Sequence, residues 1–453
     1  MSLPKQILTL TLWPFLQNML GTLVSVSDRM IAGATMSTTE LPEVFNAMGL
    51  IVYVAWLLMI VLGAVATGAQ AIVSRAFGAK NQKLTEAASG QALTLGLLSG
   101  VISGAIVWLL LPALINMFGL TGAAADYALD YLNIIILSVP FSAFIFVANG
   151  CLRAGGDTKT PFGVMLVVNV INVLLSLLLM KYSLNPSEYG IAGLAWGTFG
   201  GWLIGAMLMA YVLFRRKGKK GVLNLELPDL AWNWVVGRRI TRIALPQCIE
   251  ILGMWSIHIF GVWMLSNHLV QKAAIGAHGL VVMVESISFM PGFALGTAAS
   301  TLAGQYLGAG SKDGALRAVR ACWITGVTLM GSAGLVIVLF AEPLVRLMSP
   351  VDGVQNAMAV DILHYVGWVQ PFFATAIVLK MAMRGVGATV TVMVASFGTM
   401  LVFRVGLVYL AFIYFAEEMT LLKVWWIMMF DLVAQAGLFT ILYKRKKWLD
   451  SEV

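Results

Sequence analysis

The chain has 453 residues, of which 60% are apolar and only 11% are charged. A soluble domain carries about a quarter charged residues, so this chain has too few charges to cover a surface that faces water. The composition excludes a soluble enzyme and predicts that most of the surface faces lipid. We expect no nucleic-acid partner despite the net charge of +8, because the positive residues fall in loops on one predicted side of a membrane.

Apolar stretches of about 20 residues, the length needed to cross the hydrocarbon core of a bilayer, follow one another along the chain. Within one of them Gly96, Gly100 and Gly104 recur every four residues, which predicts a face where a neighbouring helix packs closely. We predict an all-α membrane protein whose twelve spans have the approximate limits 7–33, 45–73, 88–112, 128–150, 161–181, 190–214, 241–265, 274–303, 320–340, 357–383, 389–415 and 419–443.

The loops between these spans differ in charge on the two sides of the membrane. One side holds most of the Lys and Arg residues, whereas the other holds only Lys181, Lys272 and Arg346 beside several acidic residues. The excess of positive loop charge marks the cytoplasmic side. Both termini are therefore predicted to be cytoplasmic, in a multi-pass protein of the inner membrane, and this requires an even number of spans.

The sequence repeats itself after about 231 residues. Pro140 corresponds to Pro371, and Arg153 corresponds to Arg384, both at an offset of 231. Further proline and glycine landmarks recur at nearly the same offset. The repeat therefore predicts two halves with the same topology, related by an axis along the membrane normal.

This repeat divides the chain into three predicted parts. They are an N-terminal six-helix bundle at 1–214, a basic cytoplasmic linker at 215–239 and a C-terminal six-helix bundle at 240–453. Two such bundles around a central cleft move a solute by alternating access when one bundle rocks against the other. The organisation therefore favours a transporter.

Three segments carry a resemblance to a known family. They are VSDRMIAG at 26–33, GCLRAGGDTKTPF at 150–162 and IGAHGLVVMVESISFMPGFALGTAASTLAGQYLGAG at 275–310. Together they resemble the multidrug and toxic compound extrusion (MATE) family, and the details are most similar to its DinF-like prokaryotic branch. The resemblance covers nearly the whole chain in order.

The resemblance implies a fold and an activity. The fold is two six-helix bundles in a V shape around a central cavity. The activity is antiport, in which inward movement of Na⁺ or H⁺ drives the export of amphipathic, often cationic organic compounds. We accordingly expect a small organic substrate, the lipid bilayer as surroundings, no cofactor other than the coupling ion, and a monomer.

Asp28 is the main candidate for ion coupling in the N-terminal bundle, because VSDRMIAG matches a family position that contributes to a cation or proton site. Asn172 and Thr198 are its expected partners from the fifth and sixth spans, and Ser176 stands where several relatives have a second acid. A single carboxylate among neutral oxygens still suits Na⁺, but we favour the proton. The alternative is an interfacial ion pair with Arg29.

The C-terminal bundle has more charged residues inside its predicted spans. Glu250, Glu285, Asp431 and Arg404 lie there, and His278 shares a helix face with Glu285, seven residues away. Three acids and one base predict a net negative charge after pairing, which would attract a cationic substrate or the coupling ion. The alternative is that Arg404 neutralises one acid in a structural pair. A lone buried histidine is more often structural.

Two other functions are open to a chain of this kind. A flippase for lipid-linked saccharides would keep several cationic groups in its cavity, whereas this chain has only Arg404 well inside a span and Lys380 near a cytoplasmic end. A membrane-embedded enzyme would need a catalytic motif, and neither HExxH nor GxSxG occurs in any predicted span. Both are less well supported than an exporter.

Overall fold

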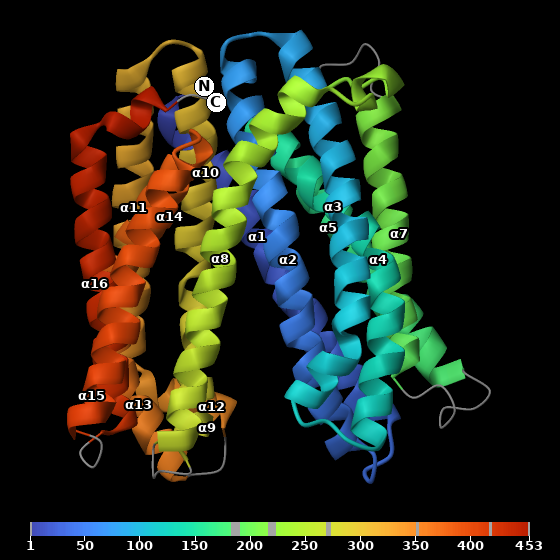
Figure 1. Cartoon of the computed structure of the whole chain (residues 1–453), viewed down its shortest axis with the longest axis vertical. Coiled ribbons are helices and arrows are strands. Elements are labelled where there is room, and N and C mark those ends of the chain that lie inside the picture. Colours follow the sequence, from blue (N-terminus) through green and yellow to red (C-terminus); the bar gives the residue numbers. More distant parts are fainter. Residues whose placement is uncertain are drawn as a thin grey trace. The chain divides into compact units, whose positions relative to one another are not determined.

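In the computed structural model, every regular element that the structure describes is a helix (Figure 1). The predicted all-α class is therefore confirmed. Lys272 and the basic residues 216–220 of the predicted linker lie outside the described residues. The described residues are 2–182, 191–215, 223–268, 273–349, 353–415 and 419–451.

The helices match the predicted spans closely. Among the described residues, ten helices are long and apolar enough to cross a membrane, and there are eleven such spans if α9 and α10, which meet at a bend of 42°, form one span. The first helix, with 33 residues, is about 50 Å long at the rise of an α-helix. The elements are α1 (Leu3–Thr35), α2 (Leu41–Gly78), α3 (Gln82–Met117), α4 (Ala123–Ala154), α5 (Lys159–Tyr182), α7 (Ala192–Arg215), η1 (Leu227–Leu230), α8 (Trp234–His268), α9 (Ala274–Ser288), α10 (Met290–Gly308), α11 (Lys312–Leu339), α12 (Ala341–Met348), α13 (Val354–Gly385), α14 (Thr389–Thr399), η2 (Met400–Gly406), α15 (Leu407–Phe415), α16 (Leu421–Arg445) and η4 (Lys447–Asp450).

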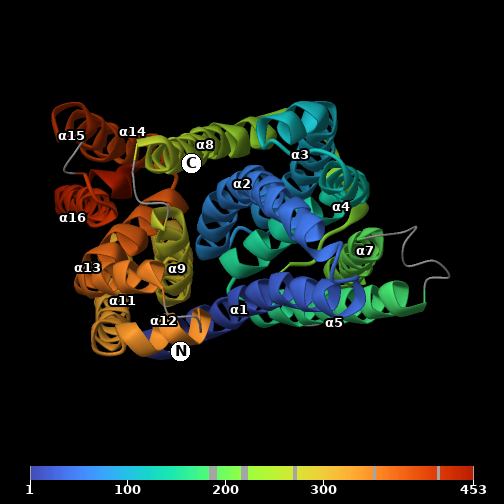
Figure 2. The same ribbon diagram turned by 90° about the horizontal axis from the view of Figure 1, so that it is seen from below.

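The chain divides into two compact units. The N-terminal unit is Leu16–Ala244, and in it α4 packs against α2, α3 and α7, while α5 pairs with α7 (Figure 2). Glycines permit the close approach that the sequence predicts. A Cβ atom at Gly100 of α3 would lie 2.9 Å from Pro140 Cα of α4, and one at Gly201 of α7 would lie 2.8 Å from Val168 O of α5.

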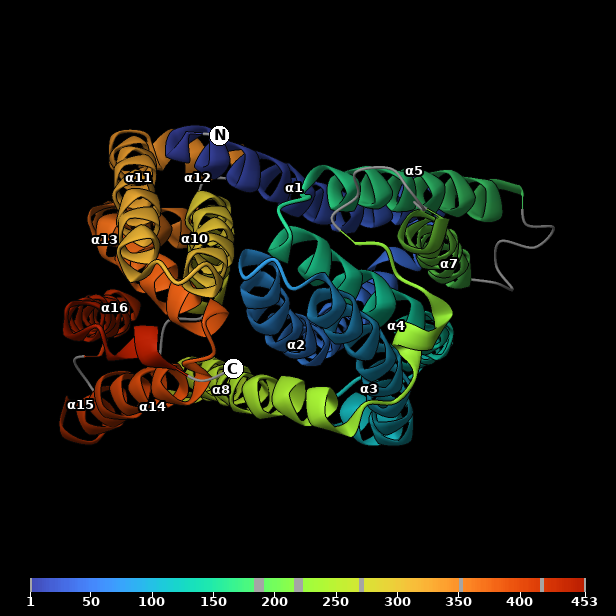
Figure 3. The ribbon, with the colours of Figure 1, turned by 90° about the horizontal axis from the view of Figure 1, so that it is seen from above.

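The C-terminal unit consists of Met1–Phe15 and Leu245–Val453. Its helix α13 packs against α10, α11 and α16, as α4 does against α2, α3 and α7 in the other unit (Figure 3). The two ends of the chain lie at the same end of this unit, as an even number of spans requires (Figure 1). Which side of the membrane they face remains a prediction.

These units begin and end at different residues from the predicted halves. The first 15 residues belong to the C-terminal unit, because Ile7 and Leu10 are buried there in an apolar cluster with Leu302 and Trp448. Residues 223–244 belong to the N-terminal unit, because η1 packs against α3. The described part of the linker is therefore a packed segment.

Two spans of the C-terminal unit depart from a regular α-helix. The eighth breaks at Phe289, where Pro291 enters the first turn of α10; proline has no N–H for a helical hydrogen bond, so the span bends there. The eleventh contains the π-helix η2 around Arg404. Such widened turns are frequent at functional sites.

Candidate functional site

Asp28 lies on α1 in the interior of the N-terminal unit. Its side chain is buried, and its Oδ1 atom has no hydrogen-bond partner in the described part of the chain. The neighbouring Arg29 is exposed instead. A buried carboxyl oxygen without a partner is costly to maintain, so Asp28 has the features of a site that takes up a proton or a cation.

Neutral side chains from three other helices form a connected group in the same unit. Asn172 Nδ2 of α5 donates a hydrogen bond of 2.8 Å to Thr198 Oγ1 of α7. The buried Tyr131 of α4 contacts the Thr198 side chain through its hydroxyl group, which also experiences the charge of Asp28. The structure therefore brings the predicted partners Asn172 and Thr198 together and links them to Asp28 through a residue that the sequence analysis missed.

Ser176 lies one helical turn after Asn172 at the contact between α5 and α7. Its side chain is completely buried, and its Oγ atom has no hydrogen-bond partner among the described residues. A Cβ atom on Gly197 would lie 2.1 Å from this oxygen, so the absent side chain of Gly197 makes room for it. Together with Asn172 Oδ1, which is also unpartnered, the cluster offers one carboxyl group and several neutral oxygens.

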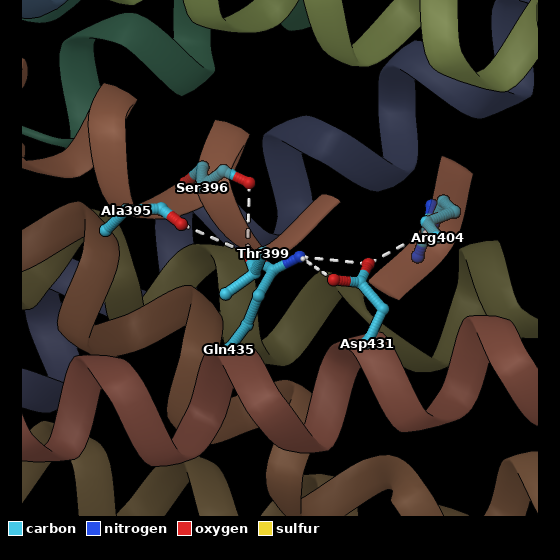
Figure 4. Close-up of polar contacts among 6 residues, drawn as sticks. All are labelled: Ala395, Ser396, Thr399, Arg404, Asp431 and Gln435. Atoms are coloured by element: carbon cyan, nitrogen blue, oxygen red, sulfur yellow. Dashed lines mark hydrogen bonds and ion pairs between the residues drawn. The ribbon is translucent and has the colours of Figure 1, made fainter. Parts of the chain in front are cut away.

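The C-terminal unit holds its buried acids in ion pairs. Glu250 of α8 lies 2.6 Å from Arg384 Nη2 of α13, and both side chains are largely buried. Asp431 Oδ2 of α16 lies 3.1 Å from Arg404 Nε of η2. Gln435, one turn further along α16, donates to both oxygens of Asp431 at 3.1 and 3.2 Å (Figure 4).

The predicted net negative charge of this unit is wrong. Arg384 lies one residue beyond the predicted span 357–383, but the structure places it in the last turn of α13, where it neutralises Glu250. Lys380, one turn earlier, is half-buried with its Nζ atom 5.9 Å from the centre of the Phe439 ring. The ammonium group of Lys380 interacts electrostatically with two acids and two bases, which are Glu250, Asp431, Arg384 and Arg404. With Glu285 included, three acids and three bases balance.

Glu285 and His278 share α9 as predicted but have different surroundings. Glu285 is half-buried just before the break at Phe289, within reach of the charge of Arg404. His278 is buried, and neither ring nitrogen has a hydrogen-bond partner in the described stretches. Its ring lies 5.3 Å from the Trp425 ring and 6.1 Å from the His258 ring, centre to centre.

A small, mostly apolar pocket opens beside these rings. His258, His278 and Arg404 supply its polar atoms, and the other lining residues are apolar. No group of three or more His, Cys, Asp or Glu side chains suited to a metal ion occurs among the described residues. The pocket therefore offers a cationic guanidinium group and two imidazole rings on apolar walls.

Comparison with known proteins supports the resemblance of the sequence. The model of the MatE family matches residues 15–178 and 246–410, once in each half of the chain. A probable multidrug resistance protein NorM from Thermotoga maritima is 28% identical over 447 residues, covering 98% of this chain and 93% of that protein. An FAD transporter from Shewanella oneidensis is 23% identical over 295 residues and covers 64% of each chain.

Among solved structures, one described as MATE in the bent conformation superposes with a TM-score of 0.89. The superposition covers 99% of this chain and 97% of the other, at 18% sequence identity. The likeness at this level of identity establishes the fold.

Proposed function

The chain belongs to the multidrug and toxic compound extrusion (MATE) family of membrane transporters, and on this basis we propose that it exports amphipathic organic compounds by cation-coupled antiport. The chain is a multi-pass membrane transporter and not an enzyme. The name of the Thermotoga maritima relative supports multidrug export. The two units, each with its own match to the family model, support alternating access.

The proposed coupling site is Asp28, and the proposed coupling ion is the proton. The observation that supports it is the buried Oδ1 atom of Asp28, which has no hydrogen-bond partner among the described residues and whose charge acts on the neutral Tyr131 side chain. Uptake of a proton neutralises this carboxyl group without any further ligand. Na⁺ is the alternative, with Asn172 and Ser176 as additional neutral oxygens.

The proposed substrates are cationic, as the sequence predicts. Fewer unpaired acids are present to attract a cation than the sequence predicts. Glu250 and Asp431 are already paired, so Glu285 is the one predicted acid of the C-terminal unit without an ion pair among the described residues. A second candidate class is organic anions. It is favoured by the bases Arg384 and Arg404, whose charges act on the third base Lys380, and by the relative named FAD transporter.

Reconstitution into proteoliposomes tests both parts of this proposal. We expect a pH gradient without Na⁺ to drive movement of the cationic dye ethidium. Asp28→Asn should reduce this movement at least about tenfold, a loss equivalent to about 1.4 kcal/mol, with unchanged protein yield. Asp130→Asn, at an exposed position of the same unit, is the matched control and should behave as the unmodified chain.

Three outcomes of this assay contradict the proposal. Transport that follows only a Na⁺ gradient overturns the proton as the coupling ion. Full transport by the Asp28→Asn variant overturns the site. Movement of FAD but not of ethidium replaces the cationic substrate class with the anionic one.

A further inference from the structure

The segment that precedes α8, residues 229–233, is hydrogen-bonded to α3. Thr94 Oγ1 of α3 donates a hydrogen bond of 2.9 Å to Leu230 O, and the backbone N–H of Asn233 donates to the buried Gln91 side chain. Gly90 lets the backbones approach closely, since a Cβ atom there would lie 2.2 Å from Asp229 O. The start of α8 therefore has a fixed position on the N-terminal unit.

Two tryptophans stand at this fixed position and are open to the surroundings. Trp232 is 48% exposed and Trp234 is 71% exposed, and their ring centres lie 5.7 Å apart. The adjacent Val235 is 63% exposed. Exposed tryptophans are enriched at the boundary between membrane and water, where the ring fits the headgroup level.

Three arginines follow within the next two turns of α8. Arg238, Arg239 and Arg242 are all exposed. Arg238 lies four residues after Trp234 and four before Arg242, so these three side chains share one helix face. None of the three arginines has an ion pair in the described part of the chain.

The acid that precedes these arginines most closely, Asp229, is engaged with the backbone. Asp229 accepts a hydrogen bond of 2.8 Å from the backbone N–H of Glu226, within the short helix η1. The first N–H groups of α8 are also occupied, because Asn233 Oδ1 accepts from Val235 N at 3.1 Å and from Val236 N at 3.2 Å. The positive charge available to a ligand is therefore that of the three arginine side chains along α8, and not that of the helix N-terminus.

We propose that the surface formed by Trp232, Trp234, Arg238, Arg239 and Arg242 is a binding site for anionic phospholipid headgroups. Guanidinium groups bind phosphate oxygens with two parallel hydrogen bonds, and the tryptophan pair packs against the glycerol and upper acyl region of the same lipid. Basic side chains beside a helix that enters the bilayer are attracted to anionic lipids. The hydrogen bonds of Leu230 and Asn233 to α3 hold this surface in place before the lipid binds.

Native mass spectrometry of the full-length chain in detergent, titrated with phosphatidylglycerol or phosphatidylcholine, tests the site. The unmodified chain should bind phosphatidylglycerol more tightly, and added salt should weaken the preference. Replacing all three arginines with Gln should remove the preference, a loss of up to about a hundredfold for three charges. Because the arginines are exposed, these variants should fold normally.

The matched control removes three exposed positive charges from the C-terminal unit by Arg317→Gln, Lys444→Gln and Arg445→Gln. It should retain the preference for phosphatidylglycerol. Trp232→Ala with Trp234→Ala should weaken the binding of both lipids while leaving the preference intact. An unchanged preference in the triple Arg variant, or an equal loss in the control, overturns the proposal.

Discussion

The two units share a topology but differ in how their last two spans are joined. In the N-terminal unit, α5 and α7 are in close contact along five glycines of α7, and their polar link is the neutral pair Asn172–Thr198. In the C-terminal unit, the corresponding pair of η2 and α16 is joined by the ion pair Arg404–Asp431. No atom lies within 4 Å of a Cβ built on Gly437 of α16.

This difference indicates which of the two units couples transport to the movement of an ion. The repeat keeps the packing of α4 and of α13 against three neighbouring helices, whereas the chemistry of the two interiors differs. In the N-terminal unit the buried acid Asp28 has no ion pair among the described residues. The C-terminal unit balances its acids against bases. An unpaired carboxyl group gains most from taking up an ion, so the comparison favours coupling in the N-terminal unit and a structural role for most C-terminal charges.

The largest expected effect tests that structural role. Arg384→Gln leaves Glu250 buried and unpaired, which should lower the free energy of unfolding by about 3–5 kcal/mol. Thermal unfolding of the purified chain measures this loss. The double variant Glu250→Gln with Arg384→Gln should recover most of it, because no buried charge is then unpaired. A double variant as unstable as Arg384→Gln alone would show that the pair does not act as a unit.

An intermediate effect tests the glycine contact between α5 and α7. Gly201→Ala places a Cβ atom 2.8 Å from Val168 O, and the overpacking should cost about 1–3 kcal/mol. Gly437→Ala is the matched control in the corresponding helix of the other unit. It should be neutral or stabilising by up to about 1 kcal/mol, because alanine favours a helix over glycine. Equal destabilisation by both changes would contradict the inference that only the N-terminal unit depends on a close glycine contact between its last two spans.

The smallest effect on stability concerns the hydroxyl group beside Asp28. Tyr131→Phe removes the link between Asp28 and Thr198 and should cost about 1 kcal/mol or less in stability. Proton-driven dye transport should nevertheless slow severalfold, because the polar group nearest in charge effect to the Asp28 carboxyl group is lost. Tyr127→Phe, one turn earlier on α4 with only a 3.4 Å contact to Glu40, is the control and should transport normally.

The all-α class and the positions of most helices could be predicted from the sequence, because hydropathy and loop charge indicate where the chain crosses a membrane. The break at Phe289 and the π-helix around Arg404 did not, since both are local departures within apolar stretches. The membership of Ile7 in the C-terminal unit was also missed. It depends on a contact with residues about 300 positions away, which no local pattern reports.

The candidate sites were predictable to different degrees. Asn172 and Thr198 were expected together, and they are hydrogen-bonded, although their role in coupling remains a prediction. Tyr131 was missed, because one tyrosine near the start of an apolar span resembles an ordinary interfacial residue. Arg384 was assigned to a loop by its position at a span end, and only the three-dimensional structure shows that it pairs with Glu250.

Release of protons on substrate binding tests the central claim most directly. The purified chain is placed in a weakly buffered detergent solution with a pH indicator, and a saturating amount of ethidium is added. The unmodified chain and the Glu285→Gln variant should release protons, whereas the Asp28→Asn variant should release none. Undiminished release from Asp28→Asn, or its disappearance in Glu285→Gln alone, would place the coupling in the C-terminal unit and contradict this account.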